Sequence, residues 1–113
     1  ARLYHARLSS IKELHLPPPP DSGEIYYDAF QNYEIEAKER DRLVAFLKEK
    51  GIEILISWGG KGVHQFKNLG LTHFHLPRTE QLFRNVLMLP LHTELTDDQL
   101  EYVSDVIHEF YGY

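Results

Sequence analysis

The sequence predicts a small α/β domain of the α+β type, in which an antiparallel or mixed sheet of about three strands is covered by helices. Two observations support this prediction. Apolar residues at helical spacing alternate along the chain with short runs rich in isoleucine, tyrosine and phenylalanine. The length of 113 residues also suits one domain with one core, since domains commonly hold roughly 100–150 residues.

The chain opens with apolar positions at helical spacing, which predict a leading helix over residues 1–16. Four prolines then fall within residues 17–23. Proline lacks an amide proton and disfavours helix before it, so this stretch predicts a stiff connector in preference to a ligand for a proline-binding groove. Residues 24–113 are expected to form the core of the domain. They begin with a predicted strand over 24–37, because its aromatic residues and isoleucines favour β-structure.

A second helix is predicted over residues 38–51, because Leu43, Val44 and Leu47 share one face and Gly51 can end the helix. The next six residues, 52–57, alternate between apolar and other side chains. This alternation predicts a strand whose buried face carries Ile52, Ile54 and Ile56.

The last third of the chain predicts a short helix over residues 78–86, a short strand over 87–90 and a C-terminal helix. Thr96 with Gln99 three residues later is a capping box, which marks the start of that helix. Its buried stripe is expected at Leu100, Val103, Ile107 and Phe110.

The composition excludes several classes of protein. A net charge of −5 argues against the broad basic surface that binds nucleic acid. No apolar run approaches the roughly 18 residues that cross a bilayer, and the absence of cysteine excludes disulfides and thiolate sites. No signal peptide is visible, so a cytoplasmic protein is expected. The chain begins with Ala1 and its only methionine is Met88, which favours a fragment of a longer protein.

The stretch ISWGGKGVHQF, residues 56–66, concentrates chemistry in one loop. Its glycines permit positive φ angles and close backbone approach, and its lysine and histidine can bond phosphate or hydroxyl oxygens. The alternative is a tight turn with an exposed lysine, since the phosphate-loop pattern is absent. We expect a substrate-binding role for Trp58, Gly59, Gly60, Lys61, His64 and Gln65.

Other candidate sites are weaker. His73 and His75 can point the same way from an extended segment and ligate a metal, but spacing suggests no third ligand. No metal site and no catalytic residue are therefore predicted. No arrangement of serine, histidine and aspartate, and no paired carboxylates, can be specified from spacing.

Three segments together resemble the C-terminal small domain of the DegT/DnrJ/EryC1/StrS family, whose members are pyridoxal-phosphate-dependent sugar aminotransferases of fold type I. They are RLYHARL, RDRLVAFLKEKGIEILISW and LPRTEQLFRNVLMLPLHTELTDDQLEYVSDVI. The last is the most specific, because it keeps the spacing between two LP pairs and an L-T helix start. Many members carry H-Y-P-x-P-L-H where this chain has WGGKGVHQ, which matches a subgroup pattern. Only His64 corresponds in kind to the last histidine of that segment.

The resemblance implies that a preceding large domain holds pyridoxal phosphate, through a lysine, a carboxylate partner and a phosphate site absent from this chain. The intact enzyme is then expected to be a homodimer that transfers an amino group, usually from glutamate, to a nucleotide-linked keto sugar in amino sugar biosynthesis. In this interpretation the chain shapes the sugar pocket, contacts its own large domain and is inactive alone. The alternative is a stand-alone module that binds a small anion or another protein and has no catalytic activity.

Overall fold

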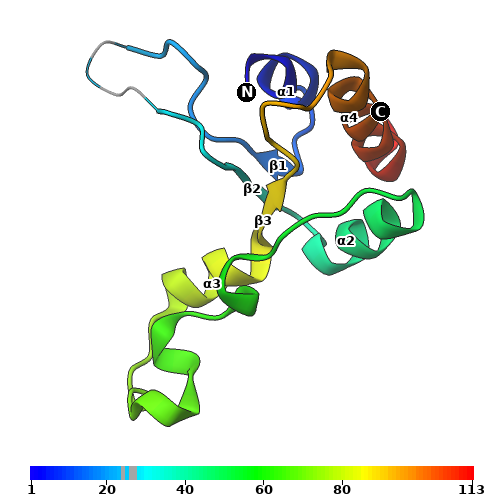
Figure 1. Ribbon diagram of the computed structural model, residues 1–113. Coiled ribbons are helices and arrows are strands. Elements are labelled where there is room, and N and C mark those ends of the chain that lie inside the picture. Colours follow the sequence, from blue (N-terminus) through cyan, green and yellow to red (C-terminus); the bar gives the residue numbers. More distant parts are fainter. Residues whose placement is uncertain (24, 26–27) are drawn as a thin grey trace.

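A computed structural model of the chain describes residues 1–23, 25 and 28–113 (Figure 1). In chain order its elements are α1 (Arg2–Leu8), β1 (Leu14–His15), β2 (Tyr33–Ala37), α2 (Arg40–Glu49), the 3-10 turns η1 (Ser57–Gly60), η2 (Val63–Gln65) and η3 (Lys67–Leu69), α3 (Pro77–Asn85), β3 (Val86–Leu89) and α4 (Asp97–Tyr111). Helices with a small antiparallel sheet confirm the predicted fold class. No helix in the described ranges is long and apolar enough to span a bilayer.

The sheet has the strand order β1-β2-β3, and both neighbouring pairs are antiparallel. Tyr33 lies opposite Leu89 and Ile35 lies opposite Leu87. These four side chains are buried, whereas the alternate residues of β2 are exposed or half-buried. One face of the sheet is therefore covered and the other is open, as a two-layer architecture requires.

Helices α1, α2 and α4 gather on one side of the sheet (Figure 1). The α1 helix packs on α4, and α2 contacts both α4 and β2. One contiguous hydrophobic core joins the helices to the covered face of the sheet. It comprises Tyr4, Leu8, Ile11, Tyr33, Ile35, Ala37, Leu43, Leu47, Ile52, Leu87, Leu89, Leu100, Val103, Val106 and Ile107.

The prediction of a leading helix over residues 1–16 is wrong in extent, because α1 ends at Leu8. Ile11 is buried as its spacing suggested, but it lies in the turn after the helix. Leu14 and His15 instead pair with β2 as an edge strand. Backbone hydrogen bonds to a neighbouring strand thus replace the helical bonds that these residues would otherwise make.

Two strand predictions are also corrected. Of the strand expected over 24–37, only Tyr33–Ala37 is a strand; residues 24, 26 and 27 lie outside the described residues. Residues 52–57 keep the predicted alternation in part, with Ile52 buried and Leu55 exposed, but form only an isolated bridge from Leu55 to Met88. The 3-10 turn η1 begins at Ser57, two residues after that bridge, so the extended segment is too short to form a ladder.

The predicted helix ends are confirmed where local capping specifies them. Gly51 has φ +78° after α2, and the amide of Ile52 donates to the carbonyl of Leu47 at 2.9 Å, as in a Schellman motif. At the start of α4, Thr96 Oγ1 accepts from the amide of Gln99 at 3.3 Å, and Gln99 Oε1 accepts from the amide of Thr96 at 3.0 Å. These bonds form the capping box.

Candidate functional site

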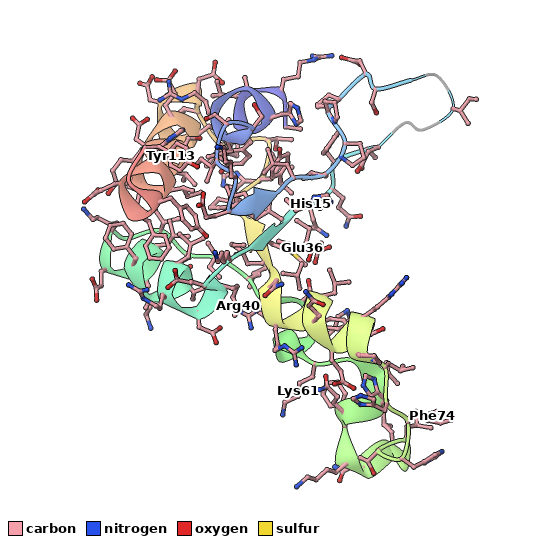
Figure 2. The ribbon with its side chains drawn as sticks, turned by 180° about the vertical axis from the view of Figure 1, so that it is seen from behind. His15, Glu36, Arg40, Lys61, Phe74 and Tyr113 are labelled. Atoms are coloured by element: carbon pink, nitrogen blue, oxygen red, sulfur yellow. The ribbon has the colours of Figure 1, made fainter. Side chains whose placement is uncertain are left out.

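Residues 57–85 form a lobe that projects away from the sheet and its helices (Figure 1). The lobe holds the turns η1 to η3 and helix α3, and α3 contributes no buried residue. Two backbone hydrogen bonds between Leu55 and Met88, of 3.3 and 2.8 Å, close its base. Figure 2 shows Lys61 and Phe74 on this lobe, at a distance from the C-terminal Tyr113. The glycine-rich loop singled out in the sequence is therefore carried by an element outside the core.

The charge of the lobe is opposite in sign to that of the rest of the chain. Lys61, Lys67, Arg78 and Arg84 are its cationic residues, and Glu80 is its only acidic residue. The remainder of the chain has twice as many acidic as basic residues, 16 against 8. The lobe also contains three of the seven histidines. A local excess of positive charge attracts anionic groups even when the whole chain is negative.

The loop begins with three consecutive residues in the left-handed region. Trp58 has φ +54°, Gly59 has φ +62° and Gly60 has φ +74°. Glycine adopts such angles readily, whereas tryptophan rarely does, so the backbone at Trp58 is strained. Trp58 is 77% exposed as a residue, so its side chain can contact a ligand.

Arg40 lies between the loop and the core, and the sequence interpretation did not identify it as a site residue. Its side chain is buried; Nη1 donates to the carbonyl of Val86 at 2.8 Å and Nε donates to Asp41 Oδ1 at 2.6 Å. A Cβ on Gly60 would lie 3.3 Å from Nη2 of the same guanidinium. Figure 2 shows Arg40 at the start of α2. Glycine at position 60 thus lets the loop pack closely on Arg40.

His64 is the buried member of the loop. Its Nε2 lies 3.1 Å from Glu80 Oε1, which also accepts a 3.1 Å bond from the amide of Leu76. His75 Nδ1 lies 3.4 Å from the same oxygen. These donors, with His64 first, lower the pKa of the Glu80 carboxyl. A Cβ on Gly62 would lie 2.8 Å from His64 Cε1, so glycine is needed there for steric reasons.

The predicted binding residues differ in exposure, and Gly60 is half-buried beside Arg40. Trp58, Gly59, Lys61 and Gln65 are exposed, although Gln65 Oε1 accepts a 2.9 Å bond from the amide of Gly62. His64 is buried and paired with Glu80, a residue that the prediction missed. In the sequence, Glu80 occurs within the segment LPRTEQLFRNV that resembles the family.

His73 and His75 contact different neighbours in the structure. His73 packs on the ring of Phe74, and His75 is largely exposed beside Glu80. Across the described residues, no three His, Cys, Asp or Glu side chains are arranged to hold a metal ion. Among the hollows lined by described residues, two that are open to solvent, of about 850 and 1150 Å³, have no residue of 58–65 in their lining.

The chain is similar to aminotransferases of known structure. The fold matches a crystal structure of a DegT DnrJ EryC1 StrS aminotransferase from Brucella abortus, with a TM-score of 0.82 and 28% identity, over 99% of this chain and 29% of that one. The family model described as the DegT/DnrJ/EryC1/StrS aminotransferase family matches residues 1–108. The chain belongs to this family, and it is a portion of the sugar aminotransferase fold.

Two curated relatives are similar in sequence. A pleiotropic regulatory protein from Geobacillus stearothermophilus is 39% identical over 104 residues, which are 90% of this chain and 27% of the relative. A UDP-N-acetyl-3-dehydro-alpha-D-glucosamine 3-aminotransferase from Acidithiobacillus ferrooxidans is 30% identical over 95 residues, 84% of this chain and 25% of the relative. The chain thus spans about a quarter of the length of these relatives. Enzymes of the family use pyridoxal phosphate.

Proposed function

We propose that this chain is the C-terminal small domain of a pyridoxal-phosphate-dependent aminotransferase that acts on a nucleotide-linked keto sugar. In this proposal residues 58–65 face the sugar nucleotide. The observation that carries it is the excess of basic residues on the projecting lobe, since a sugar nucleotide presents a diphosphate beside its sugar. The exposed Lys61 supplies a cation, and the exposed indole of Trp58 supplies a surface for a ring.

One relative supports a nucleotide sugar as the substrate class, because the similar protein from Acidithiobacillus ferrooxidans is named for a UDP-linked sugar. Family membership also favours this proposal over an anion-binding or interaction module of independent origin. The homodimer and the contact with a large domain are part of the same proposal. A loop that projects from its own core can reach a pocket completed by another domain or subunit.

The lysines of this chain do not fit the cofactor. A lysine that forms a Schiff base must lose its proton, which burial promotes. Five of the six lysines are exposed, and Lys50 is half-buried in an ion pair with Glu109 at 2.7 Å. We therefore place the cofactor lysine in the part of the enzyme that precedes this chain. Pyridoxal phosphate supplies the electron sink for amino transfer when it is bound there.

A pair of lysine variants of the full-length enzyme tests the proposed substrate site. Lys61→Ala removes a charged hydrogen bond to the diphosphate, which is worth about 1.5–3 kcal/mol, or roughly tenfold to hundredfold in kcat/KM for the sugar nucleotide. Lys67→Ala is the matched control, because Lys67 is also an exposed lysine of the lobe but lies outside the loop. We expect unchanged cofactor binding and melting temperature in both variants. Equal kinetics for the two variants would remove the loop from the substrate site.

A further inference from the structure

The carboxylate of Glu80 is placed where the loop meets helix α3. Its side chain is 16% exposed, and it is the only acidic group of the lobe. The amide of Glu80 donates to the carbonyl of Leu76 at 2.9 Å, while its Oε1 accepts from the Leu76 amide at 3.1 Å. Helix geometry therefore fixes the position of this carboxylate independently of the loop.

The same oxygen determines how His64 is oriented. An ionised carboxylate can only accept hydrogen bonds, so the 3.1 Å contact requires the proton of His64 to be on Nε2. The ring is also confined on its other edge, since a Cβ on Gly62 would lie 2.9 Å from Nδ1. A histidine held at one nitrogen and packed along its edge has one orientation and one neutral tautomer.

The second nitrogen of His64 remains available. Within the described residues Nδ1 makes no hydrogen bond. This atom is not fully buried, so it keeps some contact with solvent. In the neutral tautomer that Glu80 selects, Nδ1 carries a lone pair and accepts a hydrogen bond. A sugar hydroxyl is a donor of the kind that this atom can bind.

We propose that Glu80 is a positioning residue for sugar recognition, which holds His64 Nε2 so that Nδ1 accepts a hydrogen bond from a sugar hydroxyl. This inference rests on the proposed function, because it requires residues 58–65 to face the substrate. In this proposal two side chains of the loop bind different parts of the substrate. Lys61 binds the diphosphate, while His64, fixed by Glu80, binds the sugar.

The test uses four variants of the full-length enzyme. Glu80→Ala is expected to raise KM for the sugar nucleotide about tenfold and to change kcat less than threefold. Glu80→Gln keeps an oxygen that accepts from Nε2, so it should restore KM to within about threefold of the wild type. His64→Ala should match Glu80→Ala, and the double variant should be no worse than His64→Ala, because residues that act through one contact are not additive. Gln81→Ala, an exposed neighbour on α3, is the control and should behave as wild type.

A spectroscopic readout separates positioning from a general structural role. In the ¹⁵N spectrum of histidine-labelled enzyme, His64 should show the Nε2-protonated tautomer in the wild type and in Glu80→Gln, and mixed tautomers in Glu80→Ala. The same mixture of tautomers in the wild type overturns the inference, whatever the melting temperatures of the variants.

The kinetic outcomes distinguish the inference from the proposed function on which it rests. A normal KM for Glu80→Ala beside an impaired His64→Ala refutes the positioning role and leaves the substrate site in place. Losses that multiply in the double variant also refute it. Normal kinetics for both His64→Ala and Lys61→Ala refute the proposed substrate site, and the inference fails with it.

Discussion

Replacing Gly62 by alanine tests whether tight packing in the loop holds His64 in place. The backbone at Gly62 has φ −72°, an angle that alanine adopts without strain. The new methyl group, however, would lie 2.8 Å from Cε1 and 2.9 Å from Nδ1 of His64, and 3.1 Å from Cγ2 of Thr79. Such contacts are too short, so the imidazole or the loop backbone must shift, which disturbs the 3.1 Å contact between His64 Nε2 and Glu80 Oε1.

The size of the effect follows from two opposing terms. Overpacking costs about 1–3 kcal/mol, while the loss of freedom in the unfolded chain returns about 0.4–1 kcal/mol. The net destabilisation is then about 1–2 kcal/mol, which corresponds to a factor of roughly 5–30 in a local opening equilibrium. Because the lobe lies outside the core, this opening is expected to be local and to leave the global unfolding transition nearly unchanged.

Amide hydrogen exchange measures this opening directly. The Leu76 amide donates to Glu80 Oε1, so its exchange should be about 5–30 times faster in Gly62→Ala. Gly59→Ala is the matched control, since a Cβ there meets nothing within 4 Å and disturbs only a backbone with φ +62°. Leu76 should exchange at its wild-type rate, within about twofold, in the control. Equal exchange rates for the Leu76 amide in both variants would show that the packing of Gly62 does not maintain the contact between His64 and Glu80.

Four further results are expected. Thr96→Ala removes the cap of α4 and should lower the free energy of unfolding in urea by about 1 kcal/mol, whereas Thr72→Ala, an exposed site in the lobe, should not. The pKa of the Glu80 carboxyl is lowered, so its contact with His64 is fully stabilising at and above the usual glutamate range and weakens as pH drops through the lowered value. Protection of the Leu76 amide from exchange should fall over the same pH range. A carboxyl titration midpoint at the ordinary glutamate pKa would contradict this. Mixed with pyridoxal phosphate, reduced with borohydride and digested, the 113-residue chain should yield no stoichiometrically labelled lysine. The isolated chain should also self-associate through exposed apolar side chains such as that of Phe74, and sedimentation as a single monomer at high concentration would argue against this.

The features of the fold that were predicted correctly are those determined by residues close together in the sequence. The end of α2 at Gly51 and the start of α4 at Thr96 depend on local capping bonds, and both are observed. The ends of the strands depend on distant partners instead. Leu14 belongs to a strand only because it pairs with Ala37, and helical spacing in the first 16 residues carries no information about that pairing.

The same distinction applies to the candidate site. The glycines and exposed cations of the loop are visible in composition, so the loop was identified as a candidate. The contacts that shape it span longer separations, 16 residues from His64 to Glu80 and 46 from Arg40 to Val86. No local pattern specifies these pairs, and the residue types of the loop do not indicate that His64 is buried.

The paired hydrogen bonds between Leu55 and Met88 have an evolutionary consequence. They bring the two ends of the lobe together at its base, so the chain returns to the sheet close to where it left it. Insertions, deletions and new side chains can then accumulate in residues 57–85 with little cost to the sheet or to helices α1, α2 and α4. Such a segment is suited to exchange between relatives as a cassette. One scaffold can thereby acquire a lobe of different surface chemistry by recombination, provided that the incoming segment keeps a glycine where the backbone passes the guanidinium of Arg40.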